Sequence, residues 1–320
     1  MRTEEDIKKE LKEKNKDMRM REANVRLNPA TGGMAYSASV GLYYAFSLLI
    51  LMLLVIFKAD KNEEIVTYAN YLAAPLAIFL CTVLILRFRN IRFKAVFHFK
   101  CKFRYYIIAL LLVFGLLFSL SWINDLSLKF FKLFGYNERE SYFPNLSGGY
   151  IVPALLVIAL LPAVFEECLF RGLMLSCCRT SMGGVATIFT VGFCFSLFHG
   201  SPEQTFYQFI AGCVFTFIAL RSGSILPSVL MHFLNNAVIV VLQACGALGV
   251  DGALKISAGG SIALIVVSAA CFIGAIVWLS LDGIPLRKSE KHASRSFYMF
   301  ASFGIFAMAV VWTTTLFGLG

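Results

Sequence analysis

The sequence predicts an all-α fold, a polytopic transmembrane helical bundle with about eight or nine spans. Three observations predict it: the composition, the length of the apolar runs, and the charge of the loops between them. Apolar residues make up 58% of the 320 residues and charged residues only 15%, whereas soluble domains carry roughly 25% charged residues. A chain of this composition is expected to bury its helices in lipid rather than in a soluble core.

Apolar runs of spanning length follow one another from residue 37 to the end of the sequence. A span requires roughly 20 apolar residues at about 1.5 Å each. The candidate spans are 37–57, 65–86, 105–123, 149–170, 184–199, 204–220, 225–243, 260–281 and 297–317. The chain then divides into a charged N-terminal arm (1–35), N-terminal helices (36–147), a core that carries the polar motifs (148–243), and C-terminal helices (244–320).

Charge in the loops predicts the orientation. The stretch 87–104 contains no acidic residue, and its cations are Arg87, Arg89, Arg92, Lys94, Lys100, Lys102 and Arg104. Loop 282–296 is also basic, so the positive-inside rule places both on the cytoplasmic side, with the N-terminus inside and the C-terminus outside. The first apolar run lies behind a long polar stretch, which predicts a retained span rather than a signal peptide.

The same composition argues against several classes of protein. The net charge of +10 lies in short loops and not in a basic stripe with interleaved aromatics, so no nucleic-acid partner is predicted. The nine cysteines lie mostly inside or beside apolar runs and form no CxxC pair, which favours small buried residues over a zinc ribbon or a redox motif. The predicted partners are the lipid bilayer and a peptide or protein substrate.

Two adjacent carboxylates, Glu166 and Glu167, interrupt the apolar run 149–170. A charge at the centre of a span costs about 2.5–3.5 kcal/mol, so such residues persist mainly for function or for pairing. Glu167 and Arg171 are four residues apart on one helical face and can form an ion pair. Glu166 points about 100° away and is free to act as a general base. The alternative is a purely structural ion-pair cluster near the headgroups.

Two further spans carry polar residues. His199 ends the run 184–199, and His232 and Asn236 share one face of the run 225–243, where both could donate hydrogen bonds to a developing oxyanion. The alternatives are an interfacial histidine and an interhelical hydrogen-bond pair. Counting residues from the turn near 182–184 places Glu166 and His199 about 25 Å deep, but counting from 222–224 places His232 shallower by roughly 10 Å.

Taken together, these motifs resemble those of the CAAX-protease and bacteriocin-processing (Abi) family, which includes the type II CAAX prenyl endopeptidases. The resemblance covers roughly residues 148–243 and rests on Glu166-Glu167-x-x-x-Arg171, Phe195-x-x-x-His199 and His232-x-x-x-Asn236. It implies a multi-helix intramembrane endopeptidase whose substrates are membrane-associated, either prenylated or of the bacteriocin type. Such an enzyme is compatible with a multi-pass protein of a bacterial cell membrane.

The resemblance also implies roles for the individual residues. Glu166 and His199 would bind and activate a water molecule, and His232 and Asn236 would line an oxyanion hole. Glu167 and Arg171 would support that arrangement. A zinc ion held by Glu166, His199 and His232 and a metal-free glutamate mechanism both stay open at this point. Two other functions compete: a non-catalytic membrane scaffold or immunity protein, and a proton-coupled transporter.

Overall fold

The computed structural model describes residues 26–137, 143–179, 181–249, 254–286, 288 and 293–318. Most of the charged arm predicted over 1–35 therefore lies outside the described residues. Within the described ranges the regular elements are all helices, apart from one isolated bridge between Leu248 and Leu254. The elements are α2 (Pro29–Ile56), α3 (Glu63–Phe88), α4 (Phe93–Val96), α5 (Arg104–Ser119), α6 (Trp122–Lys132), η1 (Gly148–Tyr150), α7 (Ile151–Ala154), η2 (Leu155–Leu160), α8 (Leu161–Glu167), η3 (Cys168–Met174), α9 (Leu175–Cys178), α10 (Gly184–Phe198), α11 (Thr205–Ser222), α12 (Leu226–Ala244), α13 (Ala258–Leu281) and α14 (Ala293–Leu316).

The all-α polytopic bundle is confirmed. Seven helices in the described part of the chain are long and apolar enough to cross a membrane, or eight if the bent pair α5–α6 is one span. The run 184–199, predicted as a further span, forms a helix of only 15 residues. At about 1.5 Å per residue that helix is roughly 22 Å long, less than a hydrocarbon core of about 30 Å.

The first span begins earlier than the hydropathy predicts. The Asn28 side chain accepts a hydrogen bond from the Thr31 backbone N–H at 2.9 Å, and Pro29 follows as the first residue of α2. An asparagine cap followed by proline is a strong start signal for a helix. The helix therefore starts inside the region predicted as a polar arm.

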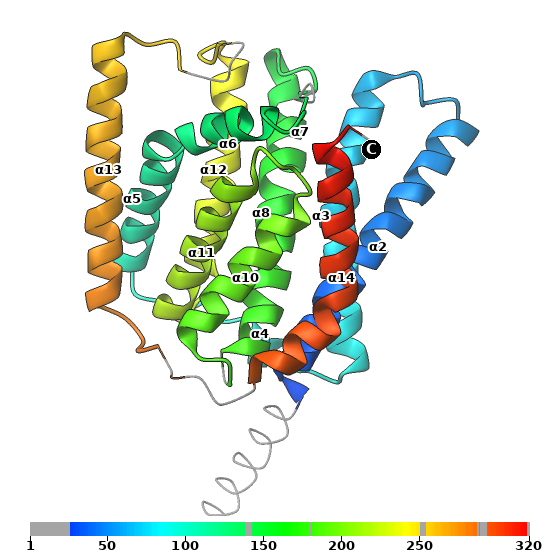
Figure 1. Cartoon of the computed structure of the whole chain (residues 1–320), viewed down its shortest axis with the longest axis vertical. Coiled ribbons are helices and arrows are strands. Elements are labelled where there is room, and N and C mark those ends of the chain that lie inside the picture. The colour runs from blue at the N-terminus through cyan, green and yellow to red at the C-terminus, as the bar shows by residue number, and fades with distance from the viewer. Residues whose placement is uncertain are drawn as a thin grey trace, which may run out of the picture.

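The third span also differs from its prediction. The apolar run 105–123 forms α5 only as far as Ser119, and the chain then bends by 40° into α6. Helix α6 carries Asp125 and Lys129 among apolar residues, and this mixed composition suits a helix that lies across the end of the bundle, as Figure 1 shows. Its Phe131 is buried against Trp312 of α14, with ring centroids 5.4 Å apart.

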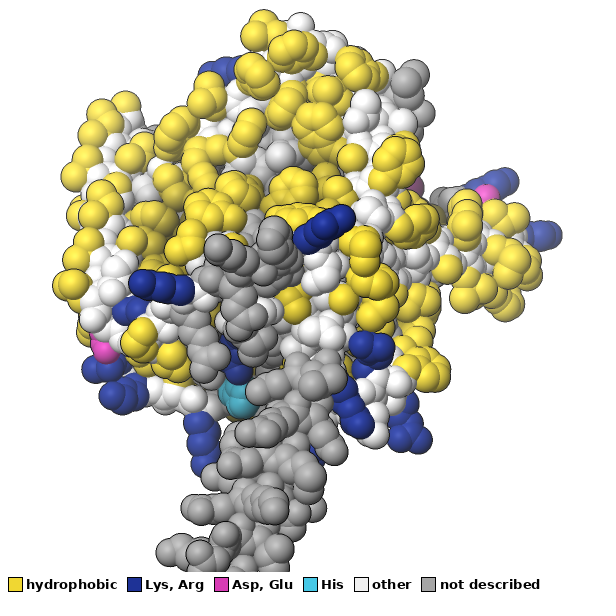
Figure 2. All heavy atoms as spheres, turned by 60° about the horizontal axis from the view of Figure 1, so that its bottom comes forward, with side chains coloured by type: hydrophobic (Ala, Val, Ile, Leu, Met, Phe, Trp, Pro, Cys, Tyr) yellow, Lys and Arg dark blue, Asp and Glu magenta, His cyan; other side chains and the backbone are white. Residues whose placement is uncertain are grey.

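The helices alternate in direction between the two ends of the bundle (Figure 1). One end, which we call the basic end, holds the segments 89–103 and 282–286 and the starts of α2 and α14. Lys and Arg side chains gather there (Figure 2). Helix α14 finishes at the opposite end, so the beginning and end of the described chain lie on opposite sides. The cytoplasmic location of the basic end stays a prediction from the positive-inside rule.

Large apolar side chains cover much of the outer surface. On α2 and α13, for example, Leu51, Ile56 and Val266 are exposed by more than half. In a membrane this surface contacts lipid, so it needs no protein partner. The buried aromatic residues lie instead at the centre, where Phe170, Phe195 and Phe215 come from η3, α10 and α11.

Candidate active site

The two glutamates lie on the broken helix Gly148–Cys178. Two π-helical segments, η2 and η3, flank the short helix α8 that ends with Glu166 and Glu167. A π-helical turn rotates the following side chains relative to a regular α-helix and is frequent at functional sites. Pro162 lies in the first turn of α8. It has no N–H to donate to the carbonyl of Ile158, four residues earlier, so that carbonyl is available to another donor.

Glu167 and Arg171 form the ion pair that their spacing predicts. Glu167 Oε1 lies 2.6 Å from Arg171 Nη1, and both side chains are completely excluded from solvent. The guanidinium also donates to the Gly212 carbonyl at 2.9 Å and to Thr216 Oγ1 at 3.3 Å. It lies over the Phe195 ring, 4.4 Å from the centroid. The charge of Arg171 is thus compensated by groups of α8, α10 and α11.

The imidazole of His232 lies between the two carboxylates. Its Nδ1 is 3.0 Å from Glu167 Oε1, and its Nε2 is 4.0 Å from Glu166 Oε2. An ionised carboxylate can only accept hydrogen bonds. His232 Nδ1 therefore carries a hydrogen and donates a hydrogen bond to Glu167. Rings of Phe195 and Phe215 contact the imidazole at centroid distances of 5.8 and 5.7 Å.

This contact shows that the shallower depth predicted for His232 is wrong. The count assumed that the α11–α12 connection lies at the end of the bundle. The connection is in fact covered by other segments: Ile225 N donates to the His98 carbonyl at 3.0 Å, and Arg221 O accepts from Ile284 N at 2.8 Å. Helix α12 therefore begins deeper than its sequence position indicates, which brings His232 level with the glutamates.

His199 caps the C-terminal end of α10. Its Nδ1 lies 2.8 Å from the carbonyl oxygen of Phe195, and the two rings are 4.8 Å apart. Since a carbonyl can only accept, Nδ1 carries the proton and Nε2 of the neutral ring is an acceptor. His199 is within electrostatic reach of both Glu166 and His232. It is therefore held in one orientation at the edge of the carboxylate pair.

Asn236 is held by three successive hydrogen bonds. Its Nδ2 donates to the Ile158 carbonyl at 3.2 Å, the acceptor that Pro162 leaves unused. Its Oδ1 accepts from Asn235 Nδ2 at 3.2 Å, and Asn235 Oδ1 accepts from the Tyr207 hydroxyl at 2.9 Å. The second N–H of Asn236 is left to donate elsewhere.

Sequence reasoning missed the supporting residues of this network. Asn235 and Tyr207 are both buried, and an adjacent Asn-Asn pair in an apolar run was a signal that could have drawn attention to Asn235. Tyr207 gave no comparable signal, because a tyrosine near the end of a span is common at a membrane interface. Their positions become meaningful only once α11 and α12 are packed together.

The structure thus joins Glu166, Glu167, Arg171 and His232 through contacts of 4.0 Å or less. His199 lies within electrostatic reach of Glu166 and His232, and Asn236 follows His232 by one turn of α12. As arranged, however, Glu166, His199 and His232 do not form the three-ligand zinc site considered above. The described residues contain no group of three or more His, Cys, Asp or Glu side chains placed to hold a metal ion.

Comparison with known protein families identifies a relationship for the part of the chain that carries these residues. Residues 148–238 match the family model of the type II CAAX prenyl endopeptidase Rce1-like proteins. No curated protein and no solved structure matches the chain. The matched stretch runs from the start of η1 into α12 and includes each residue of the cluster described above.

Proposed function

Because residues 148–238 match the family model of the Rce1-like type II CAAX prenyl endopeptidases, we propose that the chain is a member of this family and hydrolyses peptide bonds of membrane-associated substrates at Glu166. The observation that carries this proposal is the position of His232, whose imidazole lies between Glu166 and Glu167 deep in a bundle of apolar helices. Burying charge in this way is costly, and catalysis is a reason to retain it.

The charges of the cluster balance if His232 is protonated. Two carboxylates, Glu166 and Glu167, then face one guanidinium and one imidazolium, and the net charge is zero. Neutrality matters here because an uncompensated charge in a low-dielectric interior is strongly unfavourable. Glu167 serves Arg171 and His232 through the same oxygen, so it positions these residues. Glu166 is left as the base.

The nucleophile in this proposal is a water molecule held by Glu166 and His199. Glu166 accepts one proton of the water, and the acceptor nitrogen Nε2 of His199 binds its second hydrogen. The hydroxide attacks the carbonyl carbon of the substrate peptide bond. The negative charge that develops on the carbonyl oxygen is stabilised by hydrogen bonds from His232 Nε2–H and the second N–H of Asn236.

The reaction ends when Glu166 returns its proton to the leaving nitrogen. The C–N bond breaks, and the products are one carboxylic acid and one amine, so the water has been consumed and every side chain is back in its starting state. The proposed substrates are peptides anchored to the membrane by a prenyl group or by their own apolar sequence, including bacteriocin-type precursors. Such substrates reach a site among transmembrane helices by diffusion within the bilayer.

Cleavage by the purified full-length protein in proteoliposomes tests the proposal. A prenylated peptide and an unprenylated peptide of the same sequence serve as substrates, and mass spectrometry measures the products. Wild type and the control variant should cleave, whereas Glu166→Gln should not. The control is Glu64→Gln, because Glu64 is an exposed residue in the first turn of α3, at the end of the bundle opposite the basic end.

The same assay separates the competing functions. A scaffold or immunity protein would keep its biological role in a folded Glu166→Gln variant, and a transporter would carry protons without releasing peptide products. Undiminished cleavage by Glu166→Gln would remove Glu166 from the mechanism and with it this proposal.

A further inference from the structure

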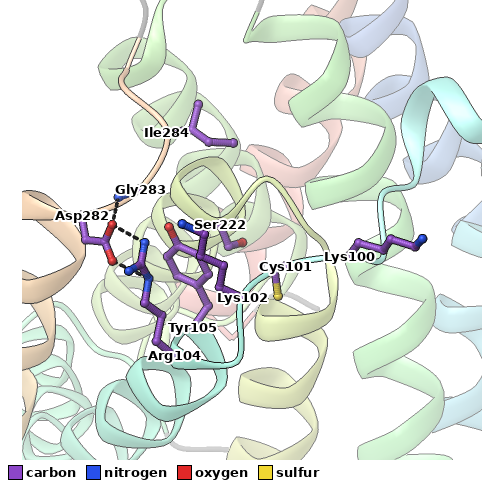
Figure 3. Close-up of a pocket in the computed structure, with 9 residues that line it drawn as sticks. All are labelled: Lys100, Cys101, Lys102, Arg104, Tyr105, Ser222, Asp282, Gly283 and Ile284. Atoms are coloured by element: carbon purple, nitrogen blue, oxygen red, sulfur yellow. Dashed lines mark hydrogen bonds and ion pairs between the residues drawn. The ribbon is translucent and has the colours of Figure 1, made fainter.

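A second candidate site lies at the basic end, outside the glutamate–histidine cluster. It is a cavity of 410 Å³ between the start of α5 and the ends of α11 and α13 (Figure 3). The charged residues of its lining are Lys100, Lys102, Arg104 and Asp282. The cavity takes no part in the proposed hydrolysis.

The lining carries an excess of positive charge. Arg104 and Asp282 neutralise each other through a two-pronged ion pair, Nη2–Oδ1 at 2.6 Å and Nε–Oδ2 at 2.5 Å. Lys100 and Lys102 are exposed, and neither ammonium group has a hydrogen bond or ion pair to any described residue. Figure 3 shows Lys100 extending away from the Arg104–Asp282 pair. Two positive charges are thus available to an anion.

The wall opposite the lysines is rigidly built. Arg221 donates to the backbone carbonyls of Leu279, Ser280, Asp282 and Ile284, at distances of 2.9, 2.8, 2.5 and 3.0 Å. These bonds fix the turn after α13 before any ligand arrives. Because this wall is already ordered, less conformational entropy is lost when a ligand binds.

Exposed apolar side chains directly precede or follow the lining residues in the sequence. Phe103 is 76% exposed and Phe99 49%, on either side of Lys100 and Lys102, and Leu281 of α13 is 84% exposed. Aromatic rings and lysine stems are typical of the level where lipid headgroups meet the hydrocarbon core. The ligand that fits both features has an anionic head and an apolar tail.

We propose that this cavity binds the headgroup of an anionic phospholipid, such as phosphatidylglycerol, from the leaflet at the basic end of the bundle. The phosphate accepts hydrogen bonds from the Lys102 ammonium group and, once the exposed side chain of Lys100 rotates toward the cavity, from the Lys100 ammonium group. The acyl chains continue along the exposed rings and Leu281. Free phosphate would satisfy only the lysines and would leave the surrounding apolar surface without a partner.

Native mass spectrometry of the full-length protein in detergent tests the proposal. Phosphatidylglycerol is titrated against phosphatidylcholine, and the fraction of protein carrying each lipid is measured. Wild type should retain phosphatidylglycerol preferentially, and Lys100→Gln/Lys102→Gln should bind it about tenfold more weakly or worse. The matched control is Lys61→Gln/Lys129→Gln, which removes two exposed lysines far from the cavity. Equal elution volumes and melting temperatures exclude misfolding as the cause of a loss.

Three results would overturn the assignment. The first is unchanged binding by Lys100→Gln/Lys102→Gln, and the second is an equal loss in the control pair, which would indicate only nonspecific attraction. The third is displacement of the lipid by an equal concentration of inorganic phosphate or glycerophosphoglycerol, which would identify a site for a soluble phosphate. The experiment measures binding alone, so its outcome is independent of whether Glu166 is catalytic.

Discussion

The Glu167 carboxylate and the Arg171 guanidinium form an ion pair of 2.6 Å in which neither side chain is reached by solvent. The same carboxylate oxygen accepts from His232. Its neighbour Glu166, one residue earlier, has a side chain that is 12% exposed, and its nearest charged partner is 4.0 Å away. Adjacent glutamates therefore occupy different environments, and this difference can be measured.

Substitution of the two glutamates should separate stability from activity. Glu167→Gln leaves the buried charge of Arg171 without its counter-ion, so we expect the free energy of unfolding to fall by about 3–5 kcal/mol. Glu166→Gln should change it by less than about 1 kcal/mol while abolishing cleavage. Thermal or denaturant unfolding in detergent measures the first quantity. Equal stability of the two variants would contradict the structural role of Glu167.

Pro162 is expected to set the position of Asn236 through the Ile158 carbonyl. In Pro162→Ala the new N–H can donate to that carbonyl and compete with the Asn236 amide. We expect kcat to fall with the stability unchanged or higher, and Asn236→Ala, which removes the donor itself, to lower kcat by about 100-fold.

A matched control and a double variant test this linkage. Pro153→Ala alters a proline of the same helix that is exposed in its first turn, so it should leave kcat unchanged. Pro162→Ala/Asn236→Ala should be no slower than Asn236→Ala alone, because both changes act on one hydrogen bond. Fully additive losses would show that Pro162 acts by another route.

Tyr207→Phe removes the hydroxyl that donates to Asn235 Oδ1. The loss of one buried hydrogen bond should cost about 1 kcal/mol of stability. If the Tyr207–Asn235–Asn236 chain orients the oxyanion donor, kcat should also fall by a few-fold while KM stays constant. A change in KM alone would assign Tyr207 to substrate binding instead.

Phe195 is the apolar centre of the cluster. Its ring contacts His199, His232 and the Arg171 guanidinium. Phe195→Leu should therefore lower both the stability, by about 1–3 kcal/mol, and kcat. Phe189→Leu provides the comparison on the same helix, since Phe189 is 55% exposed and should tolerate the change. Comparable losses in the two variants would mean that general packing of α10, and not the ring contacts, is responsible.

Much of the fold was predictable because lipid imposes a length on apolar runs. The helices α3, α12 and α13 begin and end within a few residues of the runs 65–86, 225–243 and 260–281. The bend between α5 and α6 was not predictable from hydropathy, since Trp122 and Ile123 continue the apolar run across it. The charged residues beyond them were the signal for a surface helix, and a search for amphipathic segments would have found it.

The sequence predicted which residues belong to the site better than it predicted how they are arranged. Spacing alone indicated the Glu167–Arg171 pair, because both residues lie on one helix. The level of His232 depends on where loops far away in the sequence cover the start of α12, and residue counting contains no such information. The π-helical segments around α8 likewise have no sequence signature comparable to a proline or a cap.

The early end of α10 bears on how water reaches the site. Hydrolysis consumes one water molecule per bond cut, and dry hydrocarbon supplies none. Because α10 stops at Phe198, the backbone of residues 199–204 continues without regular helical bonding inside the bundle, beneath α6 in the view of Figure 1. The polar residues Ser201, Glu203 and Gln204 of this segment are only partly buried, and polar groups at that depth attract solvent. The early end of α10 thus offers water a route to the site from the end of the bundle opposite the basic end, while the longer helices exclude water elsewhere.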